Sequence, residues 1–170
     1  MMNRTWNPMV HSFRRILHPT DFTARDAFPF QVACALARGL DAELILMHSA
    51  PMKELRQVPG YRAEIERRLN LLAHSEPNLK ITTNLLSGDP ASRIAGWANE
   101  SLCDAIVMRK SRKNWLVGRF VDSVSQRVKR LAHCPVILIP GHAVHPHLNS
   151  DWDESGGVIE PVNRTALMLS

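Results

Sequence analysis

The stretch Asp104–Val128, DAIVMRKSRKNWLVGRFVDSVSQRV, decides the fold of this 170-residue chain. It opens with the short apolar run Ala105–Met108, continues as a basic loop whose one glycine is Gly118, and begins a helix at Ser123. A continuous apolar run is typical of a strand buried on both faces of a parallel sheet. The stretch therefore predicts a strand, a loop and a helix, in an arrangement where many α/β proteins hold a phosphate.

Four more apolar runs alternate with four helical patterns along the chain. The runs are Ile16–His18, Leu44–Met47, Ile81–Leu86 and Val136–Ile139. The helical patterns cover about residues 28–40, 61–74, 90–102 and 124–132, with an irregular segment expected at 51–60. This alternation predicts an α/β fold with a doubly wound, five-stranded parallel sheet and helices on both faces. The most polar run, Ile81–Leu86, is expected at an edge.

Two strand orders, 2-1-3-4-5 and 3-2-1-4-5, are compatible with this pattern. In both, the chain reverses direction across the sheet once, and ligands bind at the carboxyl ends of the strands beside that reversal. In the second order these are the first and fourth strands. Their exits are residues 18–22, HPTDF, and the basic loop that starts at Arg109.

Two helix starts carry strong local signals. Asp89 followed by Pro90 is typical of an N-cap and a first helical residue. The sequence SVSQ, which starts at Ser123, matches a capping box. The periodicity of these two helices predicts that Leu102 and Leu131 face inward.

Composition limits the class of protein. With 21 basic and 16 acidic residues the net charge is +5, which favours anionic partners only weakly. Three widely spaced cysteines, Cys34, Cys103 and Cys134, predict buried, reduced thiols. No secretory apolar segment and no membrane-spanning run is present, so we expect a soluble, cytoplasmic protein without membrane contact. Residues 1–13 are interpreted as an extension, 14–140 as the domain and 141–170 as a polar tail.

Four segments, in order and at suitable spacing, resemble the universal stress protein family. They are RRILHPTDFT (14–23), ALARGLDAELILMHS (35–49), SGDPASRIAGWANESLCDAIVMRK (87–110) and SVSQRVKRLAHCPVILIP (123–140). The resemblance implies the 3-2-1-4-5 sheet. It also implies a homodimer formed by pairing of the last strand across a two-fold axis, through Val136, Ile137, Leu138 and Ile139. That strand is apolar and has no edge-blocking charge.

Nucleotide-binding members of the family carry Gly-x2-Gly-x9-Gly-Ser/Thr after the fourth strand. In this chain Arg109, Arg112 and Asp122 occupy the three glycine positions, and Ser123 occupies the hydroxyl position. Glycine lets the backbone approach a phosphate closely, and a carboxylate near a helix N-terminus competes for the place of the phosphate. We therefore predict a degraded nucleotide site and no tight ATP binding by the family's own mode.

The resemblance assigns further positions to the crevice. Asp21 matches the acidic residue that meets the nucleoside in binders, and Ser49 lies at the exit of the second strand. Asp21 could equally be a turn residue that accepts nearby backbone N–H groups. An alternative hypothesis is a nucleotide-binding regulator or slow ATPase, in which the side chains of Arg109, Lys110 and Arg112 bind the phosphates.

The remaining candidates are weaker. Trp115 and Phe120 in the basic loop would either cover the crevice or contact a partner. A polyanion or nucleic-acid binder using residues 109–119 is disfavoured by the modest charge, and it predicts a steep salt dependence. Three tail histidines lack the acidic or thiolate neighbours of a metal site. His18 and Asp21 could meet, but a core histidine is favoured, and no catalytic constellation points to an enzyme. The sequence thus predicts a non-enzymatic, homodimeric stress-response module.

Overall fold

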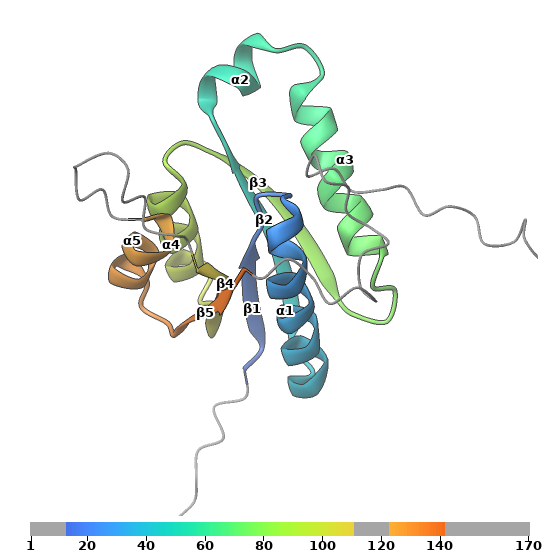
Figure 1. The fold of residues 1–170 in the computed structure, drawn as a ribbon, viewed down its shortest axis with the longest axis vertical. Helices are drawn as coiled ribbons and strands as arrows, with labels where there is room; N and C mark the ends of the chain where they lie inside the picture. Colours follow the sequence, from blue (N-terminus) through green and yellow to red (C-terminus); the bar gives the residue numbers. More distant parts are fainter. Residues whose placement is uncertain (1–12, 111–122, 142–170) are drawn as a thin grey trace, which may run out of the picture.

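The computed structural model describes residues 13–110 and 123–141, which form a three-layer α/β structure (Figure 1). In chain order the elements are β1 (Arg15–Pro19), the 3-10 turn η1 (Ala24–Asp26), α1 (Ala27–Leu40), β2 (Glu43–Ala50), α2 (Met52–Gln57), α3 (Tyr61–His74), β3 (Ile81–Ser87), α4 (Pro90–Glu100), β4 (Ala105–Lys110), α5 (Val124–Leu131) and β5 (Val136–Pro140). The five strands lie where the apolar runs predict them.

The strands form one parallel sheet in the order β3-β2-β1-β4-β5, which confirms the predicted 3-2-1-4-5 topology. The polar strand β3 lies at one edge, as expected, and β5 lies at the other. β1 is the middle strand and pairs with both β2 and β4. The chain therefore reverses direction across the sheet at β1.

Alternate residues of the central strands supply two separate cores. Ile16, Leu44 and Leu46 face α1 and α3, whereas Leu17 and Ile45 face α4 and α5. Because both faces are covered, the central strands are apolar at nearly every position, which is the pattern that identified them in the sequence. Figure 1 shows the two helix pairs on opposite faces of the sheet.

The local signals at the helix starts are confirmed. Asp89 caps α4 by accepting a hydrogen bond from the Ser92 backbone N–H at 3.0 Å, with Pro90 as the first helical residue. Ser123 caps α5 through the Gln126 N–H at 3.4 Å. The cysteines are free thiols, and burial raises the pKa of Cys34 to about 12.

Three expectations were wrong. The segment predicted to be irregular contains the helix α2, which projects from the sheet end without a buried residue. Leu102 is 79% exposed, because α4 ends at Glu100 and the chain turns there with a positive φ of 52° at Leu102. Leu131, at the end of α5, is 46% exposed, because this short helix reaches the core through Val128 instead.

No helix within residues 13–110 and 123–141 is both long enough and apolar enough to cross a membrane.

Two leucine-to-alanine substitutions test this division between core and surface. Leu69 of α3 is 1% exposed, so Leu69→Ala should lower the free energy of unfolding by about 2–5 kcal/mol, the range for truncating a buried leucine. Leu102→Ala is the matched control, and its effect should stay within about 0.5 kcal/mol, as for exposed positions. Urea unfolding measures both. Equal losses would contradict the described packing.

Candidate functional site

A crevice of about 200 Å³ lies at the carboxyl ends of β1, β2 and β4, beside the reversal of chain direction. Its walls come from the ends of these strands, from η1 and from the first residues of α4 and α5. They are Pro19, Thr20, Asp21, Asp26, His48, Ser49, Pro90, Ile94, Met108, Arg109 and Val124. The sequence placed the site here, because parallel strands deliver the loops that follow them to one end of the sheet.

Two lining residues of this crevice, Asp21 and Arg109, form an ion pair. The guanidinium of Arg109, on β4, donates a hydrogen bond from Nη2 to Oδ2 of Asp21 at 2.5 Å. The other carboxylate oxygen, Oδ1, accepts from the backbone N–H of Thr23 at 3.0 Å and from its hydroxyl at 2.7 Å. Two residues predicted for the site are thus brought together, and the charged group of each binds that of the other.

The electrostatics of Asp21 follow from these contacts. Burial alone would raise the pKa of Asp21, but the hydrogen bonds from Thr23 and the charge of Arg109 outweigh burial and lower that pKa below its ordinary value of 3.8. Asp21 is therefore a carboxylate at neutral pH. The structure confirms Asp21 as a turn residue that accepts a backbone N–H, and it places the same side chain at the crevice.

Gly141 makes room for the arginine side chain. A Cβ at Gly141 would lie 2.7 Å from Cδ of Arg109 and 3.2 Å from the carbonyl oxygen of Arg25. Distances this short force a neighbour to move, so glycine leaves the path from β4 to Asp21 open. This role was not predicted from the sequence, although a glycine directly after an apolar strand is a signal of close backbone or side-chain approach.

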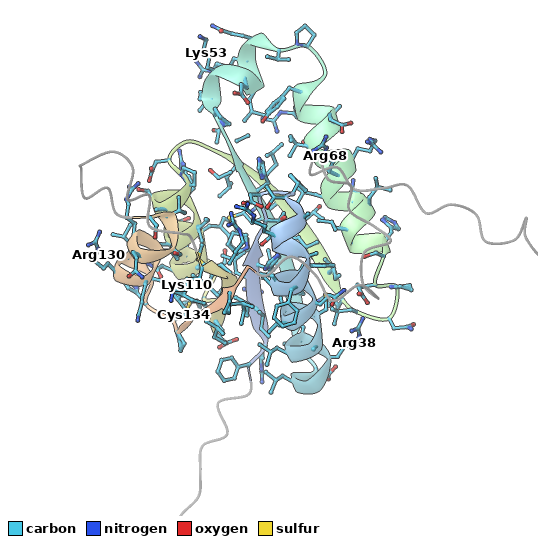
Figure 2. The ribbon with its side chains drawn as sticks, in the orientation of Figure 1. Arg38, Lys53, Arg68, Lys110, Arg130 and Cys134 are labelled. Atoms are coloured by element: carbon cyan, nitrogen blue, oxygen red, sulfur yellow. The ribbon has the colours of Figure 1, made fainter. Side chains whose placement is uncertain are left out.

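His48, which lines the crevice from β2, packs against the ring of Phe22. Phe22, directly after Asp21, is buried with a positive φ of 57°, and its ring centroid lies 4.8 Å from that of His48. His48 contacts the Thr20 carbonyl through Nδ1 at 2.8 Å, and burial lowers the pKa of His48. Arg68, labelled on α3 in Figure 2, lies 5.9 Å from the Phe22 ring centroid.

The other predicted positions have structural partners or lie outside the described residues. Ser49 donates from its hydroxyl to the Gly88 carbonyl at 3.3 Å, and Ser123 caps α5. Lys110 is exposed at the end of β4 (Figure 2). Arg112, with Asp122, Trp115 and Phe120, falls in the range 111–122 that lies outside the described residues.

A second charged pair lies beneath the crevice. His18 is fully buried on β1, and its Nδ1 donates to the Val107 carbonyl at 2.9 Å. Its Nε2 lies 3.4 Å from Oδ2 of Asp26, which is 1% exposed on η1. His18 is thus a core histidine, which is the interpretation that the sequence favoured. The carboxylate 3.4 Å from its Nε2 is that of Asp26. Asp26 could not be selected from the sequence, because it stands in a turn with no apolar pattern.

The far wall is held by Asp89, the cap of α4. Both of its carboxylate oxygens accept from the guanidinium of Arg127 on α5, each at 2.8 Å. This bidentate pair joins the starts of the two helices that border the crevice. Among the described residues, no cluster of three or more histidine, cysteine, aspartate or glutamate side chains could hold a metal ion.

The sequence and fold identify the class of protein. The sequence profile of the universal stress protein family covers residues 12–140, so this chain belongs to that family. Universal stress protein MJ0531 of Methanocaldococcus jannaschii is 26% identical over 140 residues, which are 75% of this chain and 82% of that protein.

Solved structures share the fold. A universal stress protein crystallised in complex with cAMP superposes with a TM-score of 0.63 at 21% identity, covering 77% of this chain and 99% of that one. The universal stress protein of Archaeoglobus fulgidus in complex with dAMP gives a TM-score of 0.57 at 23% identity, covering 75% and 98%. Identities at this level establish the common fold.

The lowered pKa of Asp21 predicts how the crevice responds to acid. A depressed carboxyl pKa contributes stability above its ordinary value, and this contribution is lost as pH falls through the folded-state pKa. Wild-type stability should therefore drop more steeply below about pH 4 than that of Asp21→Asn. Thermal unfolding across this range measures the difference, with Asp41→Asn, at an exposed helix end, as the control. Parallel curves for wild type and Asp21→Asn would contradict the pairing with Arg109.

Proposed function

We propose that this chain is a non-enzymatic regulatory universal stress protein whose nucleotide crevice is closed by its own side chains. The observation that carries the proposal is the ion pair between Arg109 and Asp21. Arg109 stands at the first glycine position of the binding motif, and Asp21 stands at the position that meets the nucleoside. Their mutual hydrogen bond occupies the groups that a nucleotide would need.

The size and chemistry of the crevice support this proposal. Its volume of about 200 Å³ is below the roughly 300–1,000 Å³ of typical small-molecule pockets. Entry of a nucleoside would require Asp21 to release the Arg109 guanidinium and to bind the nucleoside in its place. The Arg109 side chain would also have to leave the crevice. Separating a half-buried charge pair leaves two charges to be satisfied elsewhere. The bound nucleotides named for the solved relatives belong to those proteins, and this chain departs from the binding motif at all three glycines.

Nucleotide titration tests the closed crevice. Adding ATP and Mg²⁺ at millimolar concentration should produce no thermal shift and no calorimetric binding heat. A ligand present at 100 times its Kd would stabilise the protein by about 2.7 kcal/mol, which is readily seen. Submillimolar affinity that is lost in Asp21→Ala would overturn the proposal and favour a regulator whose arginine side chains grip the phosphates. Asp41→Ala controls for unspecific loss of a carboxylate.

We further propose that the protein acts as a homodimer through β5. The strand lies at the edge of the sheet, and its residues Val136–Pro140 carry no charged side chain. Ile137 is 37% exposed, so the edge presents an apolar side chain together with backbone groups. An edge of this composition is a template for pairing with another strand.

A charge at this edge tests the dimer. Size-exclusion chromatography with light scattering should give twice the mass of one chain for the wild type. Ile137→Lys should shift the protein to the monomer, because a lysine on an edge strand opposes strand pairing. Leu131→Lys, at the exposed end of α5, adds the same charge away from the strand and should leave the dimer intact. A monomeric wild type would refute the proposal.

A further inference from the structure

Asp26, which lines the crevice, forms a buried pair with His18 of β1. The imidazole is 0% exposed and the carboxylate residue is 1% exposed. Within the described residues, neither Nε2 of His18 nor Oδ2 of Asp26 has another hydrogen-bond partner. The two atoms face each other at 3.4 Å, so each depends on the other for compensation.

The proton on Nε2 decides whether this contact attracts or repels. The Val107 carbonyl can only accept, so Nδ1 carries a hydrogen in every state that keeps the 2.9 Å contact. With Nε2 also protonated, an imidazolium faces a carboxylate. Without that proton, the Nε2 lone pair faces a carboxylate oxygen in a buried site, where charges and dipoles interact strongly.

The surrounding charges favour the protonated state. The charged groups that act on His18 are Asp26 from η1 and Asp21 from the end of β1. Arg109 from β4 and His48 from β2 line the crevice together with Asp26 and Asp21. Arg109 is bound to Asp21, which leaves the charge of Asp26 to be balanced by His18. Burial alone would lower the pKa of His18, but the nearby carboxylate of Asp26 and the Val107 hydrogen bond outweigh it and raise that pKa.

Asp26 links the protonation of His18 to the residues that hold Asp21 and Arg109 in the crevice. It ends the η1 turn, whose backbone bond from the Asp26 N–H to the Thr23 carbonyl is 2.8 Å long. Thr23 also holds the carboxylate of Asp21, and the Arg25 carbonyl borders the passage that Arg109 follows past Gly141. A movement of Asp26 away from His18 therefore moves the groups that keep Asp21 and Arg109 in place.

We propose that His18 and Asp26 form a proton-operated latch, which holds η1 against the sheet while His18 is charged and loosens the crevice when His18 loses its proton. This inference rests on the closed crevice of the proposed function. A raised histidine pKa contributes stability that is complete below the ordinary value of 6.5 and is lost as pH rises through the folded-state pKa. The latch is therefore closed in mild acid and released toward alkaline pH.

Nuclear magnetic resonance on the wild-type protein without nucleotide tests the latch directly. The His18 ring signal should titrate above pH 6.5. Amide exchange of Asp26 and Ala27 is expressed as protection factors relative to Leu46 in β2. These factors should fall across the same range, since the contact that holds η1 is lost with the proton. Titration below pH 6.5, or constant η1 protection while His18 titrates, would overturn the proposal.

A variant gives a second test. Asp26→Asn keeps a residue that is well suited to the start of α1 and removes only the charge. Its stability should no longer decline as pH rises from 6 to 9, and burial should bring the His18 pKa below its ordinary value. His74→Gln, at an exposed position on α3, is the control and should keep the wild-type decline. Equal slopes in wild type and Asp26→Asn would refute the latch. Because no nucleotide is used, these results stand apart from the ATP titration.

Discussion

The position of β1 in the middle of the sheet is the constraint on which the rest of the structure depends. β1 pairs with β2 on one side and β4 on the other, so its carboxyl end opens into the space between two chain segments that lead in opposite directions. At this end of the sheet the loop after β1 supplies Asp21 and β4 supplies Arg109, and the two side chains form a charge pair beside the crevice.

The fold could be predicted because its signals are local. The buried strands are continuous apolar runs, and the start of α4 is fixed by an aspartate and a proline in adjacent positions. The failures occurred where periodicity continued beyond the physical end of a helix. Leu102 fits the apolar stripe of α4, but the chain has already turned there into a left-handed conformation. Similarly, α2 buries no side chain, so no apolar pattern marks it in the sequence.

The site could be predicted only in part, because its contacts join residues far apart in the sequence. The family motif identified Asp21 and Arg109 as crevice positions, but their mutual bond spans 88 residues and depends on the register of β1 with β4. The role of Gly141 is visible only once the Arg109 side chain is placed beside it. His18 could be recognised as a core histidine, whereas Asp26 required the three-dimensional turn that brings η1 back over β1.

The two charge pairs of the crevice respond to pH in opposite directions, and this difference follows from their chemistry. The outer pair depends on an ionised Asp21, whose lowered pKa makes it vulnerable only to acid. The inner pair depends on a protonated His18, whose raised pKa makes it vulnerable only to loss of a proton as pH rises. Both pairs are intact between these two limits, because the pKa of Asp21 lies below its ordinary value and that of His18 lies above. In the closed crevice that we propose, Arg109 takes the place of a ligand, and loss of the proton from one buried histidine is the simplest change that would alter the closure.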